Sequence, residues 1–230
     1  MIVITGTSRG IGNYLFKKYQ ESEGNAVFGT YFTTKPNQDK STRNIFRVDI
    51  ADQKSVQNFF ASIEKRLSSI VLINCAAISY NSFAHKSDPE LWRKVIETNL
   101  IGTYHMIRCF LPRMREQNFG RIINFSSVVA QKGTPGVSAY AASKAALWGM
   151  AKSIAQENGS KGITINNINL GYADIGMGRE QVPKEFLYKV KNQIPSKELC
   201  RPGQIFKTVE FIRDNGYLNG ISIDLSGGFV

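Results

Sequence analysis

Short apolar segments rich in β-branched residues alternate with longer segments of helical periodicity, and this alternation restricts the fold more than any other feature. The expected strands are residues 2–5, 26–31, 45–48, 70–74, 121–125, 163–168 and 221–225. The expected helices are residues 11–23, 53–67, 88–115, 138–158, 180–193 and 203–213. Strands joined through helices form right-handed βαβ units, whose parallel strands are covered on both faces. The sequence therefore predicts an α/β, three-layer, doubly wound sandwich with a parallel sheet of about seven strands.

The chain has 230 residues, which suits one domain with a full core, and neither a repeat nor a break in composition divides it. Hydrophobic residues make up 42%, and no apolar run approaches the roughly 20 residues that span a membrane. The chain starts directly with a strand-like run, without the features of a signal peptide, so we expect a cytoplasmic protein. Its 3 cysteines and 2 histidines lack the spacing of metal ligands, so we expect reduced thiols and no metal.

The formal net charge of +11 indicates anionic partners. The basic residues are scattered, and no motif of a nucleic-acid-binding domain accompanies them, so we expect neither nucleic acid nor membrane as a partner. A phosphate-bearing cofactor or an acidic carrier protein explains part of the charge better. Most of the basic residues are expected to be ordinary solvated surface.

A glycine-rich turn follows the first expected strand and precedes the first expected helix. Glycines in such a turn allow a tight bend and close approach of the backbone to a pyrophosphate. The amides and the dipole at the start of the next helix also favour phosphate. A lone glycine-rich turn is weak support, but its position between strand and helix favours a nucleotide site. The candidate cofactor-binding residues are Gly6, Ser8, Arg9, Gly10, Ile11 and Gly12.

The end of the second expected strand lacks the Asp or Glu that usually holds a free ribose 2′-hydroxyl. Together with Arg9 and Lys35, this absence favours a 2′-phosphate, and hence NADP(H) over NAD(H), although Arg9 also fits an ordinary exposed loop charge. A carboxylate after the third strand suits an adenine amino group or a helix cap, and Asp52 is better placed as the cap. The remaining candidates for the adenosine end are Tyr31, Asp49 and Ile50.

The helix expected at 138–158 carries Tyr140 and Lys144 four residues apart, on one face. An ammonium group stabilises a phenolate and lowers the phenol pKa, so the pair suits proton transfer, although a solvated helix face explains the spacing equally well. Ser127 ends the fifth strand, where side chains open into the ligand crevice or form a turn. Asn99 lies inside an expected helix, where Asn is mildly unfavourable and either kinks the helix around a water or lies on its surface.

Taken together, these residues resemble the short-chain dehydrogenase/reductase family. The resemblance is carried by Thr5-Gly6…Gly10-Ile11-Gly12, Asn74-Cys75-Ala76-Ala77, Asn99, Ser127, Tyr140 and Lys144, and it extends to Ser226-Gly227-Gly228. It implies a single dinucleotide-binding oxidoreductase domain of the Rossmann type over residues 1–230. It also implies hydride transfer between a nicotinamide and a carbonyl or alcohol carbon. Further cofactor contacts implied by the resemblance are Asn74, Ala76 and Gly171.

The resemblance also implies roles for individual residues. Tyr140 is the expected proton donor in reduction, or the base in oxidation. Lys144 is expected to lower the pKa of Tyr140 and to hold the nicotinamide ribose. Ser127 is expected to hydrogen-bond the substrate oxygen, and Asn99 to anchor a water that relays protons to Lys144.

Two segments depart from the pattern of the family. Ala77 stands where a glycine is usual after the fourth strand, a small change that adds bulk beside the cofactor. The segment 170–175 reads Leu-Gly-Tyr-Ala-Asp-Ile, where a Pro-Gly and a later Thr are usual. Ile175 occupies the place of that Thr, whose hydroxyl normally meets the nicotinamide amide. We expect the backbone of 173–175 to substitute for it.

Within the family, the chain is similar to 3-oxoacyl-acyl-carrier-protein reductases through its size, its glycine loop and the run Ser127-Val128-Val129. Arg121 and Lys161 fall where those enzymes present basic residues to the acidic carrier, or are generic surface charges. We expect NAD(P)H-dependent reduction of a carbonyl to a secondary alcohol, with a 3-oxoacyl thioester as one substrate, by a homodimer or homotetramer.

Two other functions stay open at this point. One is a dehydrogenase of a sugar or another secondary alcohol, in polysaccharide or secondary metabolism. The other, of a different class, is a non-catalytic NAD(P)-binding regulatory or scaffold protein. The segments 79–85 and 172–194 are expected to face the substrate, and a lid over the pocket or ordinary packing contacts are both open for Met177, Phe186 and Tyr188.

Overall fold

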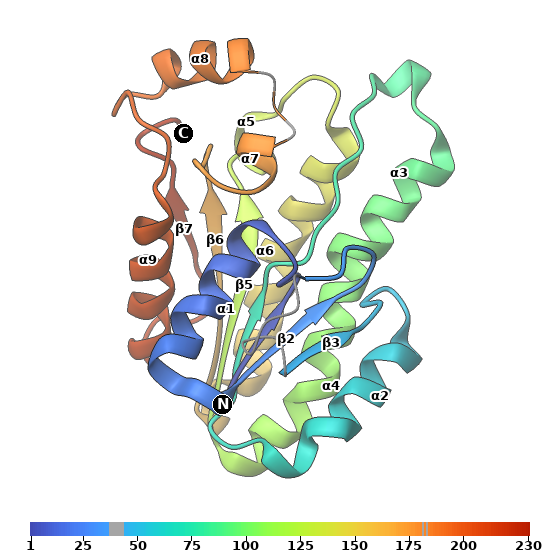
Figure 1. The fold of residues 1–230 in the computed structure, drawn as a ribbon, viewed down its shortest axis with the longest axis vertical. Helices are drawn as coiled ribbons and strands as arrows, with labels where there is room; N and C mark the ends of the chain where they lie inside the picture. The colour runs from blue at the N-terminus through green and yellow to red at the C-terminus, as the bar shows by residue number, and fades with distance from the viewer. Residues whose placement is uncertain (37–43, 181, 183) are drawn as a thin grey trace.

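The computed structural model describes residues 1–36, 44–180, 182 and 184–230, which form one parallel sheet with helices on both faces (Figure 1). The sheet has 7 strands in the order β3-β2-β1-β4-β5-β6-β7. The strands are β1 Ile2–Thr5, β2 Val27–Tyr31, β3 Ile45–Arg47, β4 Val71–Asn74, β5 Gly120–Ser127, β6 Ile163–Leu170 and β7 Ser222–Leu225. The predicted doubly wound sandwich is confirmed. The strand order reverses between β1 and β4, where such sheets open a ligand crevice.

The two faces of the sheet have separate hydrophobic cores. Helices α1 (Gly10–Glu23) and α9 (Pro202–Asp214) contribute buried residues to one core. Helices α2 (Gln53–Ile63), α4 (Gly102–Gln117) and α6 (Ser138–Asn158) contribute to the other. Strands covered on both sides explain why the strand segments read as nearly continuous apolar runs.

The helix predicted at 88–115 is divided. Helix α3 (Pro89–Ile96) is followed by a π-helical segment, Glu97–Ile101, and then by α4. Asn99 lies inside the π segment, where its carbonyl accepts a hydrogen bond of 2.8 Å from Thr103 Oγ1. Side-chain bonds of this kind compete with the regular helical ladder, and π segments often occur at functional sites.

Three short helices surround the end of the sheet at which the strands terminate (Figure 1). They are α5 (Val129–Lys132), which the sequence did not predict, α7 (Met177–Glu180) and α8 (Lys184–Gln193). The last two take the place of the single helix predicted at 180–193, and residues 181 and 183 lie outside the described part. Within the described residues no helix is long and apolar enough to cross a membrane, and no cluster of metal ligands occurs.

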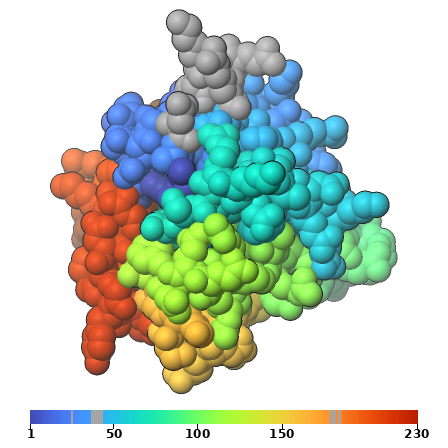
Figure 2. Space-filling view, turned by 90° about the horizontal axis from the view of Figure 1, so that it is seen from below, coloured from blue at the N-terminus to red at the C-terminus, as the bar shows by residue number. Residues whose placement is uncertain are grey.

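Figure 2 shows the opposite end of the molecule, where the strands begin. The ends of α4 (lime) and α6 (gold) and the region of α9 (red) form neighbouring parts of this surface. Arg121 is the second residue of β5 at this end, and Lys161 lies two residues before the start of β6. The two basic residues discussed for carrier recognition therefore lie at the pole away from the carboxyl ends of the strands.

Candidate functional site

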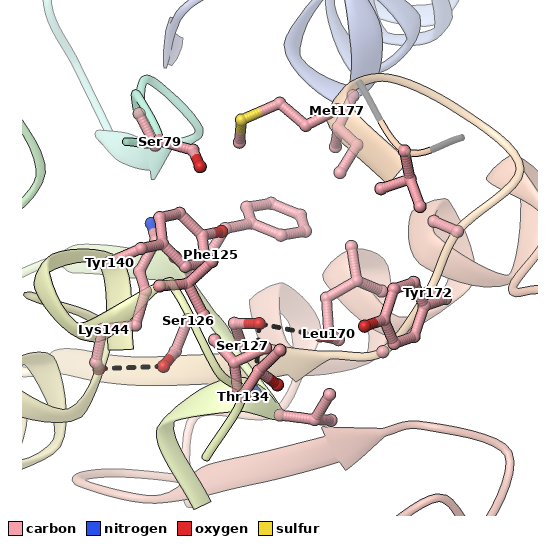
Figure 3. A pocket seen from close by; sticks show the side chains of 18 of the residues that line it. Ser79, Phe125, Ser126, Ser127, Thr134, Tyr140, Lys144, Leu170, Tyr172 and Met177 are labelled. Atoms are coloured by element: carbon pink, nitrogen blue, oxygen red, sulfur yellow. Dashed lines mark hydrogen bonds between the residues drawn. The ribbon is translucent and has the colours of Figure 1, made fainter. Parts of the chain in front are cut away.

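A pocket of about 210 Å³ opens at the carboxyl ends of the central strands. Figure 3 shows the Tyr140 hydroxyl directed into it, with Met177 reaching over it toward Ser79. Apolar side chains supply most of the lining, namely Ile11, Phe125, Val128, Val129, Val137, Leu170, Ile175 and Met177. The polar side chains that line it include Ser79, Asn81, Ser127, Thr134, Tyr140 and Lys144. The structure thus gathers three of the predicted catalytic residues at one apolar cavity.

Tyr140 and Ser127 come from different elements and line the same pocket, where the Ser127 hydroxyl donates to Leu170 O at 3.5 Å and accepts from Val129 N at 3.3 Å. Burial raises the pKa of Tyr140 to about 12, and the Ser127 hydroxyl opposes this rise. The sequence predicted that the neighbouring Lys144 lowers the pKa of this phenol, and the structure corrects that prediction because burial has the larger effect. At neutral pH Tyr140 is therefore protonated and able to donate.

Lys144 is buried, with 3% of its surface exposed. Its Nζ donates to Phe125 O at 2.7 Å and lies 5.6 Å from the centre of the Tyr140 ring. Burial lowers the pKa of Lys144 to about 8, and the Cys75 thiol acts in the opposite direction. The side chain is still mostly a cation at neutral pH, and it lies beside the Tyr140 ring.

Asn99 is fully buried, and its side-chain amide is occupied. Its Oδ1 accepts from Ile78 N at 2.8 Å, while its Nδ2 donates to Ile78 O at 2.9 Å and to Ser143 Oγ at 3.1 Å. The amide thereby ties the loop after β4 to α6, next to Lys144. The anchoring of a water by Asn99 stays a prediction.

The glycine-rich turn has the geometry that a phosphate-binding loop requires. Gly6 and Gly10 have φ angles of +73° and +58°, which favour glycine. A Cβ at Gly12 would lie 2.3 Å from Gly6 O, so only glycine lets α1 start this close to β1. Thr7 fixes the turn, because its N and Oγ1 donate to Thr30 O at 2.8 and 3.1 Å. Ile11 reaches the pocket, so the turn and the catalytic residues face one continuous space.

The carboxyl end of β2 carries a cation that the sequence analysis missed. Arg47 ends β3 and is in register with Tyr31. Its Nε donates to Phe32 O at 3.4 Å, and its guanidinium lies 5.7 Å from the centre of the Phe32 ring. Arg47 and Tyr31 share a sheet face with Gly29, which packs against Thr7 of the glycine loop. Only the strand register places Arg47 there, so the linear sequence gave no signal for it.

The other residues predicted to cap a helix or to contact the cofactor form hydrogen bonds within the chain. Asp52 caps α2 by accepting from Lys54 N at 3.0 Å, as expected, and Asp49 accepts from Ala51 N at 3.0 Å. The Asn74 side chain donates to Asn124 Oδ1 at 2.9 Å, within the sheet. Contacts of adenine with Asp49 and Ile50, and of the cofactor with Asn74 and Ala76, stay predictions.

The segment after β6 closes one side of the pocket. Gly171 N donates to Leu225 O at 2.9 Å, and Asp174 N donates to Cys200 O at 2.9 Å. A Cβ at Gly10 would lie 3.0 Å from the Cα of Gly176, so this segment touches the glycine loop directly. Ile175 lines the pocket with an apolar side chain. The Asp174 amide is occupied, so it is not the backbone group that replaces the missing hydroxyl.

Arg121 does not face the pocket. Its guanidinium donates to Gly120 O and Gly162 O, at the amino ends of β5 and β6, both at 2.9 Å, and to Arg213 O in the last turn of α9 at 3.1 Å. It also lies 4.5 Å from the centre of the Phe119 ring. Arg121 therefore links β5, the start of β6 and α9 at the end of the sheet where the strands begin.

Comparison with known proteins places these features in a family. Residues 1–185 match the family model described as short chain dehydrogenase. An acetoacetyl-CoA reductase of Shinella zoogloeoides is 34% identical over 232 residues, covering 98% of this chain and 96% of the relative. Two 3-oxoacyl-(acyl-carrier-protein) reductases, from Haemophilus influenzae and Staphylococcus aureus strain Mu50, are 30% and 31% identical, each covering 98% of this chain and 96% of the relative.

Proposed function

Since the chain belongs to the short-chain dehydrogenase/reductase family of oxidoreductases, we propose that it uses NADPH to reduce a 3-oxoacyl thioester to the 3-hydroxyacyl thioester. The single observation that supports this most is the combination in the pocket: a hydroxyl, a phenol and an ammonium group against walls that are otherwise mostly apolar. An acyl chain fits such walls, whereas a sugar requires several polar partners. The names of the relatives agree with this substrate class.

Each catalytic residue has a proposed task. The Ser127 hydroxyl binds the substrate carbonyl oxygen, and Tyr140 donates a proton to that oxygen as the carbon is reduced. The Lys144 ammonium stabilises the phenolate that remains on Tyr140. The bound NADPH supplies the hydride. The apolar walls exclude water, which strengthens these electrostatic contacts.

The residues fit a dinucleotide along the carboxyl edge of the sheet. Gly6, Gly10 and Gly12 allow the tight turn before α1, whose N-terminal amides suit a pyrophosphate, and Lys144 and Tyr140 present donors to a ribose. We propose NADPH rather than NADH because Arg47 lies beside Tyr31 at the end of β2, where a carboxylate would otherwise select a free 2′-hydroxyl, and because Arg9 belongs to the turn that Thr7 ties to Thr30 of β2.

We also propose that the chain forms a homodimer or homotetramer. Exposed apolar side chains support this on two surfaces: Leu91, Ile101 and Tyr104 on α3 through α4, and Phe211, Ile221 and Val230 near α9 and β7. Light scattering during size-exclusion chromatography measures the mass directly. A mass equal to that of one chain contradicts this part of the proposal.

The test of the proposed function is a substrate panel with purified protein. NADPH oxidation at 340 nm is followed with acetoacetyl-CoA, with a 3-oxoacyl carrier protein and with a keto sugar. We expect turnover with at least one thioester and none with the sugar. NADPH should bind at least tenfold more tightly than NADH, since charge-assisted bonds to a 2′-phosphate contribute about 1.5–3 kcal/mol. Turnover of the sugar alone would refute the acyl assignment, and tighter binding of NADH would refute the cofactor preference.

A further inference from the structure

The backbone and the side chain of Lys144 are both bound to the same stretch of β5. The Nζ donates to Phe125 O at 2.7 Å, and the Lys144 carbonyl accepts from Ser126 Oγ at 2.9 Å. The next residue of the strand, Ser127, lines the pocket. The position of the ammonium group relative to the reacting atoms therefore depends on the direction in which the Ser126 hydroxyl points.

The indole of Trp148, one helical turn after Lys144, sets that direction. Its Nε1 donates to Ser126 Oγ at 3.1 Å and to Asn169 Oδ1 at 2.8 Å. An indole N–H only donates, so the Ser126 oxygen accepts from it and keeps its own hydrogen for the Lys144 carbonyl. Ser126 and Asn169 are 3% and 1% exposed, so water offers little alternative.

A carboxylate at the edge of the sheet fixes the other end of this chain of bonds. Asn169 Nδ2 donates to Asp224 Oδ1 at 2.7 Å, and Gln131 Nε2 donates to the same oxygen at 2.9 Å. Because a carboxylate only accepts, the Asn169 amide must present its oxygen to Trp148. Ser126 and Asn169 are buried, whereas Asp224 and Gln131 are exposed, so it is the buried half of the network, with each group satisfied, that specifies one arrangement of α6 on β5 and β6.

We propose that Trp148 is a positioning residue for Lys144, and that the network Asp224–Asn169–Trp148–Ser126 holds α6 at the register on β5 that places the ammonium group beside Tyr140. The titratable groups beside Lys144 are the Cys75 thiol after β4, which raises its pKa, and Tyr140 on its own helix, whose ring centre lies 5.6 Å from Nζ. Trp148 acts on none of the reactants directly. Its effect passes through the Ser126 hydroxyl and the Lys144 carbonyl, and its bearing on catalysis rests on the proposed function.

The test measures the pKa of Lys144 in cofactor-free protein, which requires no assumption about the substrate. The protein is labelled with 13C-lysine, the Lys144 signal is assigned with Lys144→Met, and its shift is followed with pH by NMR. The native chain should titrate near 8, because Lys144 is held in a buried place. Trp148→Phe keeps an aromatic ring but removes the N–H, so water reaches a less firmly held Lys144 and its pKa should rise by about one unit.

The chain offers a matched control in its other tryptophan. Trp92 Nε1 donates to Ser138 Oγ at 3.2 Å, at the first residue of α6 and away from Lys144. Trp92→Phe removes the same kind of bond from the same helix and should leave the pKa of Lys144 unchanged. If Trp148→Phe does not fold, Ser126→Ala removes the hydrogen bond to the Lys144 carbonyl with less disturbance, and it should raise the pKa of Lys144 by the same amount.

An unchanged Lys144 pKa in folded Trp148→Phe or Ser126→Ala would overturn the inference, as would an equal rise in Trp92→Phe. Where the panel shows turnover, Trp148→Phe should lower kcat about tenfold with KM within about twofold, because a displaced catalytic group weakens the transition state more than substrate binding. A change in KM alone would overturn the link to catalysis. Absence of all thioester turnover would refute the proposed function and leave the pKa result standing.

Discussion

The two walls of the pocket are built differently. On one wall, the Nζ and the carbonyl of Lys144 both bond to β5, and Ser127, in β5, bonds to Leu170 O and Val129 N. The opposite wall, residues 172–177, is held through backbone contacts and an exposed ion pair of 3.4 Å between Asp174 and Arg179. Exposed pairs of this kind stabilise little. We call the first the fixed wall: under the proposed function it carries the reacting groups, while residues 172–177, held by packing and backbone bonds, contact the acyl chain.

The largest effect is expected from the fixed wall. Tyr140→Phe removes the proton donor but keeps the ring, so kcat for reduction should fall about a thousandfold. NADPH affinity, measured by fluorescence titration, should stay within about threefold, since most of the cofactor contacts lie elsewhere. Full activity in this variant would show that Tyr140 is not the proton donor.

A smaller effect is expected when a rise in pH removes the charge of Lys144, on the same wall. Burial lowers the pKa of Lys144 to about 8, so the ammonium form, which stabilises the Tyr140 phenolate, is lost as the pH rises through that value. The kcat/KM for reduction should therefore be flat below this pH and fall roughly tenfold per unit well above it. Lys144→Met should be slow throughout and lack this limb. A native profile that rises above pH 8 would contradict the assignment.

The smallest effect is expected from the wall formed by residues 172–177. Met177 reaches over the pocket without a polar bond, so Met177→Ala should change KM for acyl chains of different length by about threefold to tenfold and leave kcat nearly unchanged. Val129→Ala, on the other side of the cavity, serves as the control for lost apolar area. A hundredfold loss of kcat in Met177→Ala would mean that this wall also positions the reacting groups.

The sequence predicted the features that depend on local spacing. Tyr140 and Lys144 share a helix face, and Ser127 is the last residue of the buried strand β5, so helical periodicity and the rule for strand ends placed them correctly. The π segment around Asn99 was not predicted, because it depends on bonds to Ile78 and Ser143, which are distant in the chain.

Features that depend on strand register were also missed. Arg47 reaches the end of β2 only because β3 pairs with it, and Trp148 meets Asn169 only across the interface of α6 and β6. The pKa of Tyr140 was predicted with the wrong sign, since the sequence shows its neighbour Lys144 but not its burial. Local pattern thus identified the chemical groups, and tertiary packing determined how they are held and charged.

Transfer of a label from the cofactor to the substrate tests the central claim most directly. The protein is incubated with acetoacetyl-CoA and NADPH that carries deuterium at either face of C4 of the nicotinamide, and the thioester product is analysed by mass spectrometry. The 3-hydroxybutyryl product should carry one deuterium at C3 when one face of the nicotinamide is labelled and none when the other face is labelled. This is expected because the fixed wall holds the reacting groups in one orientation. A hydroxyacyl product without deuterium from either face, or no product from any 3-oxoacyl thioester, would contradict it.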